Sequence, residues 1–253
     1  MAEEAVREFR TYQASVASSR ERLYLEAEKG LVLSEAFPVD RQVLLIAGEA
    51  QRAFAYEGEA ANADRYYAAG REFGRRCLRA NGAWQVMEEL AGGRITAAGL
   101  RRFEATDLPC LRMLLTNWIR WVESVGHAGT VDLRAIGLLA ERVLELGEDG
   151  RRSWRDHWAM GMSIGLDPAA GERISDAEFH FLKAAEMEPT LATPVIDRLS
   201  SFVFQGMASD LVREELRGMG AKNYATHASS QWGLQNQRAL KRAIELLARL
   251  REN

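Results

Sequence analysis

The sequence predicts an all-α protein made of antiparallel helical hairpins that stack on one another. Apolar residues recur every three to four positions through most of the chain, which is the spacing of a helix with one buried face. The 253 residues include only 5 prolines, and no segment shows the alternating pattern of a half-buried strand. With 47% hydrophobic and 27% charged residues, the composition is that of a chain that folds by burying a core.

Short breaks divide the chain into successive helices. We expect one all-α repeat domain over residues 1–253, with an N-terminal extension helix at about 1–18 and stacked hairpins over 19–253. Gly, Pro, Asp and Asn, which start or stop helices, gather at intervals. The predicted breaks are 37–40, 80–82, 92–93, 126–130, 147–150, 167–175 and 218–223. Because the breaks are short, consecutive helices should run antiparallel.

Three segments show the helical spacing most clearly. Along 108–125 the apolar positions are Leu111, Leu114, Leu115, Trp118, Trp121, Val122 and Val125. Along 131–146 they are Ile136, Leu139, Ala140, Val143 and Leu146, and in the last segment Leu240, Ala243, Ile244, Leu247 and Leu250. Each set covers one side of a helix, so each segment is predicted to pack by that side.

The segment after Ser175 carries a repeat pattern. Ser175 and Glu178 have the spacing of a capping box, which predicts a helix that starts at Ser175. Inside that helix, four residues match the second helix of a tetratricopeptide repeat: Ala177, Phe181, Ala184 and Pro189. Small residues recur at similar offsets in Gly70, Gly74 and Cys77. The pattern predicts about four degenerate hairpins that form a tetratricopeptide-like α-solenoid with an inner groove.

Charge and cysteine content limit the classes of partner. The 33 Lys and Arg against 36 Asp and Glu give a net charge of -3, which offers no basic field for nucleic acid or an anionic membrane. The longest apolar runs, such as 43–47, are too short to span a bilayer. We therefore expect no nucleic-acid partner and no membrane insertion. Cys77 and Cys110 are expected to be buried thiols, because a single disulfide would be optional in so long a chain.

One string matches a catalytic motif. The sequence Gly161-Met-Ser163-Ile-Gly165 has the form of a hydrolase nucleophile elbow, and His180 and His227 are candidate bases. That motif needs a strand before the serine, whereas the residues before Ser163 are typical of a helix. We favour glycines that ease helix packing, and we expect no enzyme activity. A serine hydrolase that uses Ser163 stays open as an alternative.

The histidines do not suggest a metal site. Neither a Glu-x-x-His pair nor an H-E-x-x-H motif includes any of the four, which are His127, His157, His180 and His227. We expect them to be surface groups or hydrogen-bonded core groups, and we expect no metal and no cofactor.

Aromatic side chains are the candidate binding surface. Trp118 and Trp121 are three residues apart, and Trp154 and Trp158 are four apart, so each pair covers one side of a helix. An apolar groove would use such large side chains, although for any single tryptophan we favour a place in the core between hairpins. The predicted groove residues are Trp118, Trp121, Trp154, Trp158 and Phe181. A basic stripe on one helix is interpreted as a solvated face rather than a contact for an acidic partner; it consists of Arg71, Arg75, Arg76 and Arg79.

Five segments resemble, in order, the T components of TRAP transporters. They are 44–56 (LLIAGEAQRAFAY), 66–78 (YYAAGREFGRRCL), 107–118, 140–146 (AERVLEL) and 236–248 (NQRALKRAIELLA). The resemblance covers roughly residues 20–250. It implies stacked tetratricopeptide-type hairpins with an apolar channel, association as trimers, and a partnership with the periplasmic substrate-binding component of the transporter.

The resemblance leaves the compartment open. Family members are typically exported lipoproteins, whereas this N-terminus shows neither a signal peptide nor a lipid-acceptor cysteine. We expect a cytoplasmic protein if the chain is full length as given, and a periplasmic one if it is a processed family member. The leading expectation is a non-enzymatic repeat protein that binds a protein partner and an apolar small ligand. The alternative is a cytoplasmic scaffold or accessory subunit of a larger assembly.

Overall fold

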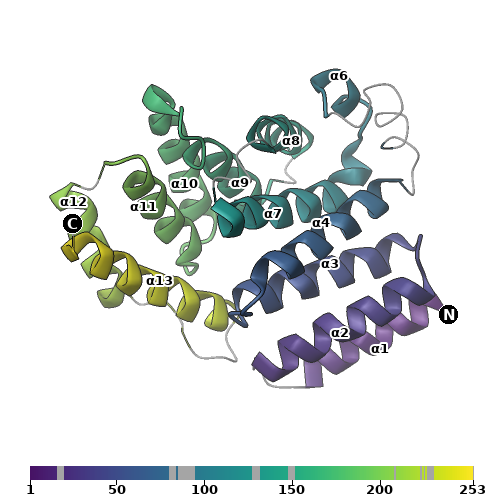
Figure 1. Ribbon diagram of the computed structural model, residues 1–253. Helices are drawn as coiled ribbons and strands as arrows, with labels where there is room; N and C mark the ends of the chain where they lie inside the picture. The colour runs from purple at the N-terminus through teal and green to yellow at the C-terminus, as the bar shows by residue number, and fades with distance from the viewer. Residues whose placement is uncertain are drawn as a thin grey trace. The chain divides into compact units, whose positions relative to one another are not determined.

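Helices make up all of the regular structure that is described. The computed structural model describes residues 1–15, 20–79, 84, 95–126, 132–147, 152–207, 209–222, 224, 226 and 231–252. Within these ranges the secondary structure is helical with no strand, which confirms the all-α class (Figure 1). The chain divides into two compact units, Met1–Arg152 and Ser153–Asn253, and each is described by itself. The predicted breaks at 80–82 and 92–93 lie outside the described ranges, and so do all but the first residue of those at 126–130 and 147–150.

Unit 1 is built from helices of which the longer ones, from α2 onward, pack in chain order. They are α1 (Ala2–Ser15), α2 (Arg20–Ala36), α3 (Arg41–Tyr56), α4 (Ala63–Arg79), α6 (Ala97–Leu100), the 3₁₀ turn η1 (Ala105–Asp107), α7 (Leu108–Val125) and α8 (Leu133–Leu146). Helix α2 packs on α3, α3 on α4, α4 on α7, and α7 on α8. Figure 1 shows α2, α3, α4 and α7 side by side. The helices predicted at 108–125 and 131–146 are thus found as α7 and α8.

Glycines on α4 allow α7 to approach closely. A Cβ atom at Gly74 would lie 2.7 Å from the Cα atom of Leu114, and one at Gly70 would lie 2.2 Å from Oδ1 of Asn117. A larger side chain at Gly74 would require a shift of the α7 backbone, and one at Gly70 would displace the buried side chain of Asn117. The small residues predicted at these offsets are therefore confirmed as packing residues.

The two cysteines form a disulfide between α4 and α7. Cys77 and Cys110 are both fully buried, with an S–S distance of 1.98 Å and a Cα–Cα distance of 5.7 Å. The prediction of buried positions is confirmed, but the prediction of two thiols is wrong. The physical reason is tertiary: the close packing of α4 on α7 brings together two positions that lie 33 residues apart in sequence.

Unit 2 holds a second set of packed helices. They are α9 (Trp154–Gly165), the 3₁₀ turn η3 (Gly171–Arg173), α10 (Ile174–Met187), α11 (Thr193–Phe204), α12 (Asp210–Gly218), the 3₁₀ turn η4 (Met219–Ala221) and α13 (Gly233–Glu252). Helices α9 and α10 form a hairpin, α11 packs on both, and α13 packs on α11 and α12. Three residues of the tetratricopeptide pattern are buried in this hairpin: Ala177, Phe181 and Ala184. Helix α10 ends at Met187, before Pro189 of the same pattern.

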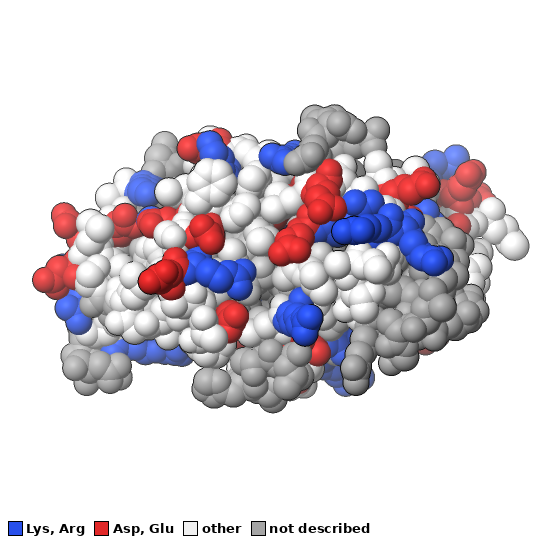
Figure 2. All heavy atoms as spheres, turned by 90° about the horizontal axis from the view of Figure 1, so that it is seen from above, with Lys and Arg blue, Asp and Glu red and all other residues white. Residues whose placement is uncertain are grey.

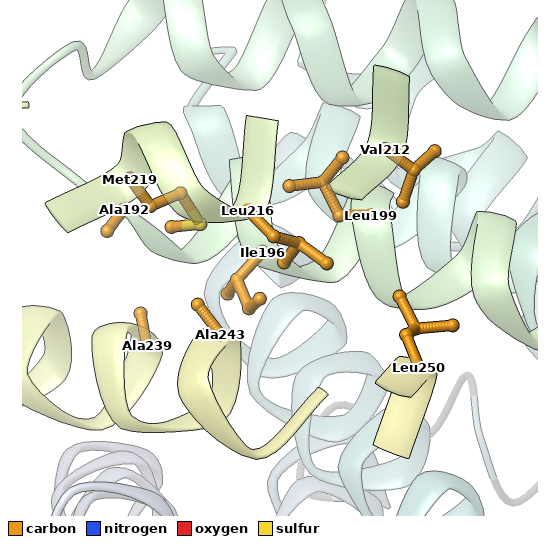
Figure 3. Close-up of a cluster of buried hydrophobic side chains, with 9 residues drawn as sticks. All are labelled: Ala192, Ile196, Leu199, Val212, Leu216, Met219, Ala239, Ala243 and Leu250. Atoms are coloured by element: carbon orange, nitrogen blue, oxygen red, sulfur yellow. The ribbon is translucent and has the colours of Figure 1, made fainter. Parts of the chain in front are cut away.

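An apolar cluster joins α11, α12 and α13. Figure 3 draws its buried side chains, with Ile196 of α11 and Leu216 of α12 meeting near its centre. On the α13 side, Ala243 and Leu250 are buried as the helical spacing of the last segment predicts, and Ala239 is buried as well, although it was not among the predicted positions. Ile244 departs from the prediction, because 69% of its surface is exposed. The buried stripe of α13 is therefore narrower than its apolar residues suggest.

The start of α10 corrects one prediction. The helix begins at Ile174, directly after η3, and no side chain caps it. Ser175 is already helical and its hydroxyl donates to the carbonyl of Glu172, while Glu178 accepts a hydrogen bond from Arg198 of α11. The predicted capping box at Ser175 is wrong, because the preceding 3₁₀ turn supplies the helix start and a neighbouring arginine takes the glutamate.

A capping box does occur where it was not predicted, at the start of α9. The Ser153 backbone N–H donates to Asp156 Oδ2 at 2.8 Å, and the side chain of Ser153 accepts from the backbone of Asp156. Across the described segments, none of the helices combines the length and the apolar character that crossing a bilayer requires.

Candidate functional site

Each unit contains a tryptophan that donates to an aspartate, and an arginine pairs with the same carboxylate. In unit 1, Trp118 Nε1 donates to Asp132 Oδ2 at 2.7 Å, and Arg71 Nη1 lies 3.3 Å from that oxygen. In unit 2, Trp158 Nε1 donates to Asp197 Oδ2 at 2.8 Å, and Arg242 Nη1 donates to Asp197 Oδ1 at 2.7 Å. The two groups contain the same residue types. They differ in how buried they are and in how many oxygens of the aspartate accept hydrogen bonds.

The group in unit 2 is closed to solvent. The side chain of Asp197 is 0% exposed, and each of its two oxygens accepts from a different residue. Trp158 is also buried. A buried carboxylate with both oxygens occupied links α9, α11 and α13, and it has no accessible capacity for a ligand. We interpret this group as part of the core.

The group in unit 1 is partly open. Both hydrogen bonds of Asp132 go to Oδ2, and no described residue donates to Oδ1. The side chain of Asp132 is 28% exposed and that of Arg71 is 20% exposed. This carboxylate therefore keeps acceptor capacity that water or a ligand can reach.

Local structure explains why Asp132 is available to α4 and α7. It occupies the N-cap position of α8, where an aspartate commonly accepts from the first turn of its own helix. Asp132 makes no such cap bond. Its carboxylate instead accepts from the Trp118 indole of α7 and pairs with Arg71 of α4. One side chain thus ties three helices of unit 1.

Two arginines of α4 lie over the tryptophans of α7. The guanidinium carbon of Arg71 is 4.5 Å from the ring centroid of Trp121 and 5.3 Å from that of Trp118. The guanidinium carbon of Arg75 is 5.4 Å from the Trp118 centroid. These are cation–π distances. We call the five residues the Arg–Trp cluster: Arg71, Arg75, Trp118, Trp121 and Asp132.

The positive charges of the Arg–Trp cluster are incompletely balanced. Burial, and then the charge of Arg75, lower the pKa of Arg71, while Asp132 and Glu72 oppose this shift. Arg75 lies 3.9 Å from Glu72, which is too long for a hydrogen bond. Its Nε atom is buried and has no hydrogen-bond partner among the described residues. The cluster therefore contains a buried donor without an acceptor.

The basic stripe of α4 is not a simple solvated face, so that interpretation is corrected. Arg76 donates to the backbone carbonyls of Ser34 and Pro38, which ties α4 to the end of α2. Arg79 lies 3.6 Å from Glu72. Arg71 and Arg75 cover tryptophan rings. Within the stripe, Arg76 therefore serves packing, whereas Arg75 keeps donors that no described residue uses.

A second polar group lies beside Trp121. Trp121 packs against a cluster that includes Tyr56 and Tyr67. Arg120 stacks on the Tyr56 ring at 4.4 Å, and the Tyr56 hydroxyl has no partner among the described residues. Burial raises the pKa of the Tyr67 phenol, and the nearby charge of Arg120 opposes this shift. Tyr67 is therefore neutral at physiological pH.

The predicted groove residues fall into two separate groups. Trp118 and Trp121 belong to the Arg–Trp cluster in unit 1. In unit 2, the rings of Trp154 and Trp158 meet edge to face with centroids 6.4 Å apart, and Trp154 also contacts Trp232. Phe181 is buried beside Gly161, where a Cβ atom would lie 3.1 Å from the phenyl ring. A groove lined by these residues stays a prediction.

Ser163 lies within helix α9 rather than on a turn. Its hydroxyl donates to the carbonyl of Met160 at 2.8 Å, and the residue is buried. A Cβ atom at Gly165 would lie 2.4 Å from Ser201 Oγ, so this glycine allows α11 to pack closely. The strand and sharp turn of a nucleophile elbow are not found at this position.

The histidines that are described pair with each other. Nδ1 of His157 and Nδ1 of His180 are 3.0 Å apart, so one of the two nitrogens donates and the other accepts. This confirms a hydrogen-bonded role for these two. His127 and His227 lie outside the described residues. In the described part of the chain, no cluster of three or more His, Cys, Asp or Glu is arranged to hold a metal ion.

The surface charges do not form one field of a single sign on the face that Figure 2 draws. Basic side chains there lie beside acidic ones, in keeping with the small net charge. Any electrostatic recognition on this face is therefore local.

Sequence reasoning missed the residues that complete these sites. Asp132 and Asp197 had no motif around them, and Arg242 was one charge among many on a helix. One signal was available for Asp132, because an aspartate directly before a helix predicts a capping role. That signal predicts a hydrogen bond to the first turn of α8, whereas the carboxylate accepts from Trp118 of α7.

Comparison with known proteins identifies no family. The chain matches no protein-family model, and no curated protein shows significant similarity to it.

Proposed function

We propose that this chain is a non-enzymatic helical-repeat protein that acts by binding another protein, in the manner of the T components of TRAP transporters. The proposal includes the finer architecture, a tetratricopeptide-like α-solenoid. In support, α2, α3, α4, α7 and α8 pack successively in chain order, as the helices of a solenoid do.

The observation that carries the binding function is the open Arg–Trp cluster. It contains a buried guanidinium Nε atom without an acceptor and a carboxylate oxygen without a donor among the described residues. The partly exposed side chain of Arg75 makes no hydrogen bond to a described residue, and the Asp132 side chain is also partly exposed. Because polar groups in proteins are normally paired, this arrangement favours a ligand-contacting role over a purely structural one.

The disulfide supports the exported form of the proposal over the cytoplasmic scaffold. Disulfides persist in oxidising compartments such as the bacterial periplasm, and they are rare in the cytosol. Cys77 and Cys110 form such a bond in unit 1. A processed, periplasmic chain is therefore the form that we propose, with the trimer of the family as its oligomeric state.

The test combines gene context with direct binding. We expect permease and solute-receptor genes beside the native gene, and we expect the purified receptor to form a saturable complex with this chain. Neighbouring genes for a cytoplasmic assembly, together with two reduced cysteines in the native protein, would instead favour the scaffold. Native mass spectrometry of the gently purified protein checks for an apolar passenger. A fluorophosphonate label that is lost on Ser163→Ala would overturn the non-enzymatic proposal.

A further inference from the structure

We propose that the Arg–Trp cluster is the docking surface for an acidic segment of a protein partner, whose carboxylates bind Arg75 and Arg71. This inference rests on the proposed protein-binding function and specifies the chemistry of the partner. It depends on three features of the cluster: unused donors, excess positive charge and indole rings that are already covered.

Arg75 supplies the unused donors. A guanidinium group has five N–H donors in a fixed planar fork. Arg75 makes no hydrogen bond to the described residues, and its nearest carboxylate is that of Glu72 at 3.9 Å. Its side chain is only 29% exposed, so water cannot fully solvate it. Binding of an external acceptor would therefore cost little further desolvation of the Arg75 guanidinium, because the protein already excludes much of the water around it.

The sign of the charge selects an anion. Arg71 and Arg75 lie on successive turns of α4. Asp132 lies 3.3 Å from Arg71, whereas the carboxylate nearest to Arg75 is that of Glu72 at 3.9 Å. Glu72 is itself shared between Arg75 and Arg79, and its side chain is half exposed. The positive charges of Arg71 and Arg75 repel each other, and a bound negative charge would reduce this repulsion.

The covered rings argue against an apolar or aromatic ligand. Arg71 occupies a face of Trp121 and lies over Trp118, and Arg75 also lies over Trp118. The edges of the guanidinium forks stay available, and a fork matches a carboxylate with two parallel hydrogen bonds. Small ligands usually need enclosure by most of their surface, whereas a partly exposed helix face suits a segment of another protein.

The experiment uses the full chain and a fluorescein-labelled oligoglutamate peptide, with binding followed by fluorescence anisotropy at low salt. We expect saturable binding that weakens by about tenfold or more with Arg75→Gln, as the loss of a charge-assisted hydrogen bond predicts. Arg75→Lys should fall between, because it keeps the charge but loses the fork. Added salt should weaken binding to the wild type.

Arg65→Gln is the matched control. Arg65 lies on the same helix and is exposed, and no hydrogen bond or ion pair of its side chain is found within the described segments. Its replacement removes the same charge and should change the affinity by less than about twofold. Circular dichroism checks that each variant keeps the helix content of the wild type. An equal loss with Arg65→Gln, or no saturable binding to the wild type, overturns the proposal.

Two further outcomes separate this inference from the proposed function. Inorganic phosphate that binds with the same dependence on Arg75, while oligoglutamate does not bind, would indicate a small-anion site and overturn the acidic-segment proposal. A solute receptor that binds wild type and Arg75→Gln equally would leave the proposed function standing and reject this docking surface. Oligoglutamate binding without any receptor complex would reject the transporter role and support the surface.

Discussion

Trp118 in unit 1 and Trp158 in unit 2 each donate a hydrogen bond from the indole to an aspartate. The two surroundings differ in how many of the nearby donors and acceptors other residues use. In unit 2, Asp197 is fully buried and both of its oxygens are used. In unit 1, Asp132 is partly exposed and only its Oδ2 accepts from described residues, and the Nε atom of Arg75, in the same Arg–Trp cluster, has no partner among them. The comparison teaches that two groups with the same residue types can differ in burial and in how many of their donors and acceptors the described residues use.

The largest expected effect tests the closed network against the open one. Asp197→Ala should lower the free energy of unfolding by about 3–5 kcal/mol, because Arg242 and Trp158 lose a buried partner. Asp132→Ala should cost only about 1–2 kcal/mol, because water can reach Arg71 at the partly exposed site. Urea denaturation measures both. Asp197→Asn keeps an acceptor for Trp158, and it provides a folded variant if the alanine variant does not fold. Equal losses at the two positions would show that the two networks do not differ as proposed.

Reduction of the disulfide should act on unit 1 alone, because the chain has only 2 cysteines and both lie there. Chain entropy for a loop of this length predicts a loss of about 3–4 kcal/mol. Hydrogen exchange followed by mass spectrometry should show that dithiothreitol reduces protection in α4 and α7 but not in α9 to α11. A thiol assay of the unreduced, unfolded protein that finds two free thiols would contradict the premise.

Glycine substitutions compare helix contacts in the two units. Gly74→Ala places a methyl group 2.7 Å from the Leu114 backbone, which cannot move alone, so we expect a loss of about 1–3 kcal/mol. The methyl group of Gly165→Ala would lie 2.4 Å from Ser201 Oγ and 2.8 Å from Ser201 Cβ; the hydroxyl can rotate away but the Cβ atom cannot, so we expect a loss of similar size. Gly137→Ala in α8 meets nothing within 4 Å and should stabilise by about 0.5–1 kcal/mol. Thermal unfolding monitored by circular dichroism gives the order, and a reversed order would contradict the close approach of α4 to α7.

The smallest effect appears only at alkaline pH. Burial raises the pKa of Tyr67 in unit 1 and that of Tyr224 in unit 2, the latter with the opposing charge of Arg198. Below pH 10 both states keep the phenol proton, so neither tyrosine contributes a pH dependence. Above pH 10 the unfolded chain loses the proton of Tyr67 while the folded chain keeps it, and stability should fall by about 1.4 kcal/mol per pH unit.

Replacement by phenylalanine isolates this slope. Tyr67→Phe should flatten the dependence of urea stability on pH above 10, and Tyr224→Phe should flatten it less, because Tyr224 is only partly buried. Unchanged slopes in Tyr67→Phe would show that the phenol is not desolvated as the structure indicates.

The helices and their main packing residues could be predicted from local pattern. The apolar spacing of 108–125 predicts α7, and Ala177, Phe181 and Ala184 are buried as their offsets predict. The candidate site could be predicted only in part. Trp118 and Trp121 were identified as a pair, but the Arg71 and Arg75 that cover them were interpreted as solvated. Helix faces follow from a period of 3.6 residues, whereas the partner of a charged side chain depends on which helix lies opposite.

The sequence by itself predicted the all-α class, the helix ends near 37–40 and 167–175, and which small residues allow close packing, but not the breaks between α3 and α4 or between α11 and α12. Only the tertiary structure decided that Cys77 meets Cys110, that Asp132 leaves its own helix for Trp118, and that Ser175 does not cap α10. The physical reason is how far apart in sequence the interacting residues lie. Helix formation depends on neighbours within a few residues along the chain, whereas a disulfide, a buried carboxylate or an unpaired guanidinium depends on groups brought together from distant positions.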